Sequence, residues 1–161
     1  MNDKISGIAG RLYYEDSHIH EFDAVVTGVY ETKDGAAVTL DRTAFFPGGG
    51  GQNADTGYIG TVRVTDVKEN GGEILHFAAA PLNVGEKYSC SLDWEQRYRR
   101  MQNHSGEHIV SGISHTLHGV ENVGFHMGGE SMTIDFDKEL TWDELMEIEK
   151  CANEAVRADI P

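Results

Sequence analysis

The chain has 161 residues, 39% of them hydrophobic and 25% charged, which is ordinary for a folded protein and excludes disorder as the default. Its apolar stretches run only a few residues, which excludes a membrane span, and two cysteines without a secretion signal indicate a reduced, cytoplasmic protein. The net charge of −14 disfavours nucleic-acid binding through overall charge alone, because a polyanion is usually met by a basic surface.

The first part of the chain predicts short strands separated by glycine turns. Its strand-like stretches are rich in β-branched residues, and turn sequences such as Lys33-Asp34-Gly35 and Asn70-Gly71-Gly72 separate them. The strands are expected at residues 24–31, 36–41, 57–67, 73–78 and 86–92. Short strands at regular spacing indicate a small β-barrel or sandwich.

A run of four glycines interrupts this strand region in Pro47-Gly48-Gly49-Gly50-Gly51-Gln52. Consecutive glycines let backbone amides approach a ligand closely, or take conformations that other residues avoid. The run is not a phosphate-binding P-loop, because no Lys-Ser or Lys-Thr follows it. Composition alone favours the alternative, a flexible hairpin tip.

The pattern changes at Asp93, a candidate helix N-cap. Apolar residues then recur at helical spacing to about Leu117, where Gly119 is placed to end a helix. Residues 131–136 alternate like a strand, and Thr141-Trp142-Asp143-Glu144 forms a capping box that opens a second helix. Helix, strand and helix make half of an α/β sandwich. We therefore expect an α+β protein with domains at 1–92 and 93–161, the second of them incomplete.

His104 and His108 form the strongest candidate site. Side chains four residues apart on a helix lie about 5–6 Å apart at Cβ, so both imidazoles can bind one ion, with zinc the expected metal. The alternative is two polar residues on a solvated helix face. Zinc takes four ligands, and His126 is a possible third, although an ordinary hydrogen-bonded loop or strand residue is the favoured interpretation of it. The set within this chain is therefore short by one or two. His104-Ser105-Gly106-Glu107-His108 also fits the His-x-x-Glu-His pattern of zinc proteases, with Glu107 as base, but the small size and the strand-rich first part disfavour that function.

Three segments in the same order and spacing, residues 40–57, 93–108 and 123–136, resemble the alanyl-tRNA editing family. This family comprises the editing domain of alanyl-tRNA synthetase and its freestanding relatives. The first segment resembles the family's glycine-rich motif, the second its zinc helix, and the third includes Val123-Gly124-Phe125-His126. The likeness covers nearly the whole chain, and the three motifs together are far more specific than any one of them.

The resemblance implies a translation-factor-like β-barrel followed by the first part of an α/β editing domain. It implies hydrolysis of the ester of mischarged tRNA(Ala), chiefly Ser-tRNA(Ala) and also Gly-tRNA(Ala). The family's zinc is held by two helix histidines, here His104 and His108, and by a cysteine and a histidine four positions apart farther downstream. Since no such pair occurs before Pro161, we expect a fragment that ends ahead of the remaining ligands and is inactive alone.

The resemblance also implies roles for individual residues. Glu107 is a candidate proton acceptor or a partner of the metal ligands, and an exposed helix acid without such a role is an equal alternative. The residues expected to contact the aminoacyl end of the substrate are Thr43, Gly49, Gly50, Gly51, Gln52 and His126. The expected contacts to tRNA phosphates are Arg97, Arg99 and Arg100, for which a solvated helix face is the alternative. A non-catalytic tRNA-binding module is the competing function, and it predicts acceptor-stem binding without turnover.

Overall fold

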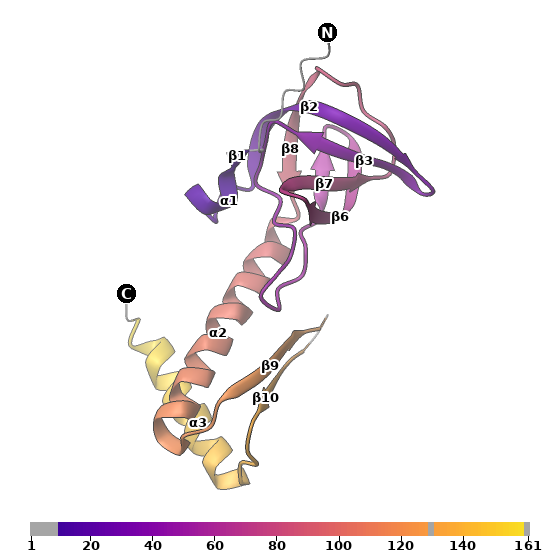
Figure 1. Cartoon of the computed structure of the whole chain (residues 1–161). Coiled ribbons are helices and arrows are strands. Elements are labelled where there is room, and N and C mark those ends of the chain that lie inside the picture. The colour runs from indigo at the N-terminus through magenta and orange to yellow at the C-terminus, as the bar shows by residue number, and fades with distance from the viewer. Residues whose placement is uncertain (1–9, 129–130, 160–161) are drawn as a thin grey trace. The chain divides into compact units, whose positions relative to one another are not determined.

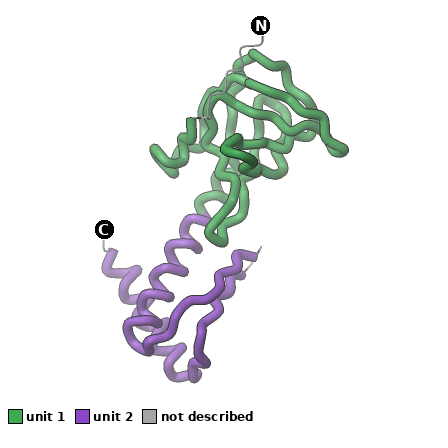
Figure 2. Tube along the Cα trace, viewed as in Figure 1, with its two compact units in different colours: residues 1–98 green, residues 99–161 purple. Residues whose placement is uncertain are grey.

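A computed structural model of the protein describes residues 10–128 and 131–159. The chain divides into two compact units, Met1–Tyr98 and Arg99–Pro161 (Figure 2). The division falls inside helix α2 (Trp94–His118), whose first residue follows Asp93, the start of the predicted second domain. The predicted mixed α+β class is confirmed: strands dominate the first unit, and helices α2 and α3 flank a strand pair in the sequence of the second.

Unit 1 contains a closed barrel in the order β2-β3-β7-β6-β5-β8 (Figure 1). The strands are β2 (Glu21–Thr32), β3 (Gly35–Leu40), β5 (Gly57–Ile59), β6 (Val62–Asn70), β7 (Glu73–Ala78) and β8 (Lys87–Leu92). The ring closes because Cys90 of β8 lies opposite Phe22 of β2 on one side and Ile59 of β5 on the other. Closure pairs both edges of the sheet, and the buried core cluster of apolar side chains fills this barrel.

The predicted strand at residues 57–67 is wrong in one respect, because the structure splits it into β5 and β6. Ile59 pairs with Val62, so Gly60 and Thr61 form a two-residue turn. Gly60 has a φ of 59°, the conformation required at the first position of a type II′ hairpin turn. Gly60 was the local signal for this turn. The apolar residues on both sides of it nevertheless continued the strand pattern, so a single strand was predicted.

Three short elements of unit 1 lie outside the barrel. Strand β1 (Gly10–Arg11) pairs in parallel with β4 (Arg42–Thr43), and helix α1 (Leu12–Glu15) follows β1. Strand β4 leads directly into Ala44–Pro47 and the four glycines. The pairing of β1 with β4 therefore fixes the start of the segment that carries the glycine-rich loop.

Unit 2 consists of α2 from Arg99 onward, strands β9 (Asn122–Met127) and β10 (Met132–Phe136), and helix α3 (Trp142–Arg157). Strands β9 and β10 pair in antiparallel fashion, with Phe125 opposite Ile134. The predicted capping box is present: Thr141 accepts from the backbone of Glu144, whose carboxylate accepts from the backbone of Thr141. Strand β9 was not predicted, because its Gly124 and His126 weaken the strand pattern.

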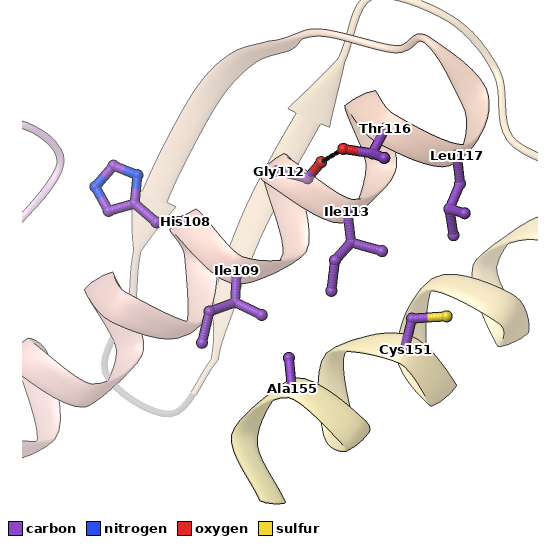
Figure 3. Close-up of a pocket in the computed structure, with 8 residues that line it drawn as sticks. All are labelled: His108, Ile109, Gly112, Ile113, Thr116, Leu117, Cys151 and Ala155. Carbon is purple, nitrogen blue, oxygen red and sulfur yellow. Dashed lines mark hydrogen bonds between the residues drawn. The ribbon is translucent and has the colours of Figure 1, made fainter. Parts of the chain in front are cut away.

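An apolar groove separates α2 from α3 within unit 2. Ile109, Ile113 and Leu117 point from α2 toward Cys151 and Ala155 of α3, whereas His108 points away from α3 (Figure 3). Few apolar side chains of this unit are fully buried among its described residues, namely Val120, Met127 and Ile148. Unit 2 therefore has a much smaller apolar core than the barrel. None of the described helices has both the length and the apolar character needed to cross a membrane.

Candidate functional site

The glycine-rich loop is an ordered hairpin tip. Gly49 and Gln52 exchange two backbone hydrogen bonds, of 2.9 and 3.0 Å, and Gly50 and Gly51 form the turn between them. All four glycines have positive φ angles, from 57° to 136°, and positive φ at both central positions is what a type I′ turn requires. The tip at Gly49–Gly51 is exposed and Gln52 is half-buried. The loop thus presents backbone without side chains at its tip.

Asp55 closes the base of this loop. Its backbone N–H donates to the carbonyl of Phe46 at 2.9 Å, and its carboxylate Oδ2 accepts from the N–H of Phe46 at 2.7 Å. Arg97, in the first turn of α2, donates from Nε to both oxygens of that carboxylate, at 2.9 and 2.8 Å, and from Nη2 to the carbonyl of Ala44 at 2.6 Å. The start of α2 therefore holds both ends of the loop.

Arg97 is consequently a correction to the predicted phosphate contacts. It is only 3% exposed, and besides Asp55 and Ala44 its guanidinium donates to the carbonyl of Ser17 at 3.1 Å. Arg99 lies about 200° farther round the helix and is exposed, while Arg100 is half-buried. The run of arginines predicted a positively charged segment. Only the arginines on the exposed face of the helix can contact a ligand, and Arg97 is not on that face.

Thr43 is a second correction to the predicted substrate contacts, because its side chain is buried within unit 1. Its hydroxyl is 2.8 Å from Nε2 of His76 and accepts the N–H of Phe45 at 3.0 Å. Nδ1 of His76 lies 2.9 Å from the carbonyl of Val38 and donates to it, which leaves Nε2 to accept from Thr43. Burial lowers the pKa of His76 to about 4, although the hydrogen bond to Val38 opposes this shift. His76 was not predicted to have a role, and its one signal in the sequence was a histidine within an apolar strand.

His104, Glu107 and His108 come together on α2 as expected from their spacing. One ligand atom of each lies within 4.8 Å of the others. The two imidazoles are stacked, with ring centroids 5.0 Å apart, and Phe125 of β9 lies 5.8 Å from the ring of His104. His104 is half-buried, and the side chain of His108 is 73% exposed. One imidazole is thus anchored against a strand and the other is open to solvent.

Glu107 is buried, with 4% of its surface exposed. Its Oε1 accepts hydrogen bonds from Ser111 Oγ at 2.6 Å and from Asn122 Nδ2 at 2.5 Å, and its Oε2 lies 3.4 Å from Nδ1 of His108. Neither of these two neutral donors was predicted from the sequence. Ser111, one helical turn beyond Glu107, was recognisable from its spacing, whereas Asn122 belongs to the strand that was not predicted.

His126 is not part of this cluster. It lies on β9 with its side chain 74% exposed, and its Nε2 is 3.4 Å from a carboxylate oxygen of Asp135 on β10. Because successive side chains of a strand point to opposite faces, Phe125 can face His104 while His126 points elsewhere. The structure therefore does not bring His126 to the two helix histidines.

The donor set of the cluster fits a divalent cation. Two imidazoles and a carboxylate are ordinary zinc ligands, and the two neutral donors on Oε1 compensate the buried carboxylate only in part, because neither of them carries a positive charge. Within the described residues, the ion pair recorded for Glu107 is the one with His108, which is charged only when protonated. A cation between the imidazoles would supply the missing charge.

A family model described as tRNA synthetases class II (A) matches residues 11–96, more than half of the chain. The chain belongs to the alanyl-tRNA editing family. It is 37% identical to the alanyl-tRNA editing protein AlaX-L of Pyrococcus horikoshii over 158 residues, which are 94% of this chain and 39% of that protein. It is 40% identical to AlaX-M of Saccharolobus solfataricus over 157 residues, 92% of this chain and 64% of that protein.

An alanine–tRNA ligase of Halorubrum lacusprofundi is 36% identical over 94% of this chain and 17% of the ligase. The chain therefore spans less than two thirds of each of these relatives. Their shared segment includes the glycine-rich loop and the histidine cluster, because more than nine tenths of this chain is aligned in all three.

Proposed function

We propose that this chain is part of a trans-editing hydrolase that deacylates mischarged tRNA(Ala), with Ser-tRNA(Ala) as the principal substrate and Gly-tRNA(Ala) as a second. The observation that carries the proposal is the cluster of His104, Glu107 and His108 in a chain of the alanyl-tRNA editing family. In this proposal unit 1 is the translation-factor-like barrel, and unit 2 is the first part of the editing domain.

Zinc is the proposed cofactor, held by His104 and His108, with further ligands from the downstream cysteine and histidine of the family pattern. When bound, it would polarise the ester carbonyl or lower the pKa of a water. Phe125 restrains the imidazole of His104, which favours a fixed ligand position on that side. Glu107 contributes a carboxylate beside the exposed imidazole of His108. The two imidazoles are already stacked in the metal-free chain, with ring centroids 5.0 Å apart.

The glycine-rich loop is the proposed contact for the aminoacyl-adenosine end of the tRNA. Gly49, Gly50 and Gly51 lack side chains at an exposed turn, so their backbone can approach a ligand closely, and Gln52 can donate or accept from its amide. Arg99 and Arg100 remain the proposed phosphate contacts. Thr43 and Arg97 leave the proposed set of ligand contacts, because both are buried and hydrogen-bonded within unit 1.

Two other functions make different predictions. A non-catalytic module would bind the acceptor stem of tRNA(Ala) without turnover. A zinc protease would need Glu107 to activate water, and the burial of this carboxylate and its two hydrogen bonds disfavour that role. Of these three functions, only the deacylase predicts release of serine from Ser-tRNA(Ala).

The deciding experiment is deacylation of Ser-tRNA(Ala) by the full-length gene product that carries this sequence. We expect serine release, and we expect His104→Ala to lower its rate at least about tenfold through loss of metal. His115→Ala is the matched control, because His115 lies on the same helix but pairs with Glu121 outside the cluster. Binding of tRNA without serine release would favour the non-catalytic module, and peptide cleavage abolished by a chelator would favour the protease.

A further inference from the structure

Glu107 joins strand β9 to one of the two histidines of the cluster. Asn122, the first residue of β9, donates to Oε1 of Glu107 at 2.5 Å and to Oγ of Ser111 at 3.0 Å. The side-chain oxygen of Asn122 accepts the backbone N–H of Gly124 at 2.9 Å. This bond fixes which end of the amide is the oxygen, so the NH₂ group must face Glu107.

The other oxygen of Glu107 faces His108. Because Ser111 and Asn122 both donate to Oε1, the carboxylate cannot rotate without breaking two hydrogen bonds. Oε2 is thereby held 3.4 Å from Nδ1 of His108, whose ring is otherwise exposed to solvent. A negative charge at this distance favours the tautomer that carries its proton on Nδ1, on the side of the carboxylate.

We propose that Glu107 is a positioning residue that Asn122 and Ser111 lock in place, and that it orients His108 with Nε2 as the metal-binding nitrogen. Metal-binding histidines commonly donate their second N–H to a carboxylate, which fixes the tautomer and makes the ligand nitrogen more basic. The inference rests on the proposed function for its metal, but the orientation of His108 is a property of the metal-free chain.

The alternative is that Glu107 is the general base of the reaction. A base must reach the water that it deprotonates, and Glu107 is 4% exposed with one oxygen occupied by two donors. His108, in contrast, has an exposed side chain that needs a fixed orientation if it is to bind a metal. The geometry therefore favours positioning over proton transfer.

The test uses the metal-free 161-residue chain and measures the tautomer of His108 by ¹⁵N NMR at about pH 8, where an ordinary imidazole is neutral. We expect Nδ1–H to predominate in the wild type and Nε2–H to gain population in Glu107→Gln. Zinc affinity, measured by competition with a chelator, should fall about 10- to 100-fold in that variant. Asn122→Ala keeps the carboxylate but removes one of the two hydrogen bonds that hold it. The variant should therefore change the tautomer population and the zinc affinity in the same direction as Glu107→Gln, by a smaller amount.

Glu121→Gln is the matched control. Glu121 lies 3.0 Å from Nδ1 of His115, so the variant removes a carboxylate beside a histidine of the same helix but outside the cluster. It should leave zinc affinity and the tautomer of His108 unchanged. An unchanged His108 tautomer and unchanged zinc affinity in both Glu107→Gln and Asn122→Ala would overturn the proposal. If the wild-type chain shows the expected tautomer but the full-length protein fails to deacylate Ser-tRNA(Ala), the proposed function is rejected and the role of Glu107 stands.

Discussion

Arg97 and Asp55 form a buried ion pair that joins the first turn of α2 to the base of the glycine-rich loop. Both side chains are almost inaccessible, and the carboxylate also accepts the backbone N–H of Phe46. The same guanidinium donates to the carbonyls of Ala44 and Ser17. One arginine thus satisfies a buried charge and two backbone carbonyls, and it ties three segments that are distant in the sequence.

Arg97→Ala is expected to lower the free energy of unfolding of unit 1 by about 3–5 kcal/mol, because it leaves the carboxylate of Asp55 buried without a partner. Arg99→Ala should change it by less than about 0.5 kcal/mol, since Arg99 is exposed. Urea unfolding followed by circular dichroism gives both values. If Arg97→Ala lowered the free energy of unfolding by less than about 1 kcal/mol, water would have to replace the arginine as the hydrogen-bond partner of Asp55.

Acid should destabilise the barrel through His76. Its pKa is lowered by burial to about 4, whereas an unfolded histidine titrates near 6.5. The unfolded chain therefore binds the extra proton between these two values, and the stabilising contribution, complete above pH 6.5, is lost as the pH falls toward 4. The full loss is about 3 kcal/mol, of which about 2 kcal/mol is lost by pH 5.

The measurement is the free energy of unfolding in urea at pH 7 and pH 5, for the wild type and for His76→Gln. Carboxylates also titrate in this range, but they contribute equally to both proteins, so the difference isolates His76. The variant should be less stable at pH 7 and should lose less stability on acidification. Equal pH dependence in the two proteins would show that His76 is not held neutral in the fold.

Two glycine substitutions should have opposite effects. Gly48 has a φ of 81°, and an added Cβ would lie 3.1 Å from the backbone nitrogen of Ala54, so Gly48→Ala should cost at least about 1 kcal/mol. Gly112 lies inside α2 with no atom near an added Cβ, so Gly112→Ala should stabilise the helix by about 0.5–1 kcal/mol. Thermal unfolding compares both variants with the wild type, and destabilisation by Gly112→Ala would indicate an unrecognised contact in the α2–α3 groove.

Zinc should bind weakly to the 161-residue chain. Two imidazoles leave a zinc ion short of its usual set of protein ligands, even with a carboxylate beside them. A chelator of moderate affinity should therefore remove the metal completely, and His104→Ala should abolish the residual binding. Stoichiometric zinc that survives the chelator would require either a further ligand in this chain or one from another molecule.

Amide hydrogen exchange should be slower in the barrel than in unit 2. The closed sheet surrounds the buried core cluster, whereas large apolar side chains of unit 2, such as Val156 and Leu145, remain exposed. We expect the most protected amides in β3, β6 and β7 and markedly lower protection in β9, β10 and α3. Equal protection in the two units would show that they unfold together.

Local patterns explain what could be predicted. The alternation of strands, the capping box at Thr141 and the helical spacing of His104 and His108 all depend on residues within a few positions of one another. The hairpin turn at Gly60 was missed because apolar residues on both sides continued the strand pattern. Strand β9 was missed because Gly124 and His126 weaken its strand pattern, and its pairing with β10 cannot be read from its own residues.

The sequence by itself determined most of the barrel strands, both long helices, the family and the pair of histidines. The tertiary structure alone decided which polar side chains are free to act: it buries Arg97 against Asp55 and Thr43 against His76, and it places Asn122 against Glu107. The physical reason is that the burial and the hydrogen-bond partners of a side chain depend on segments far away in the chain. The spacing of residues along one helix or strand carries no information about those segments.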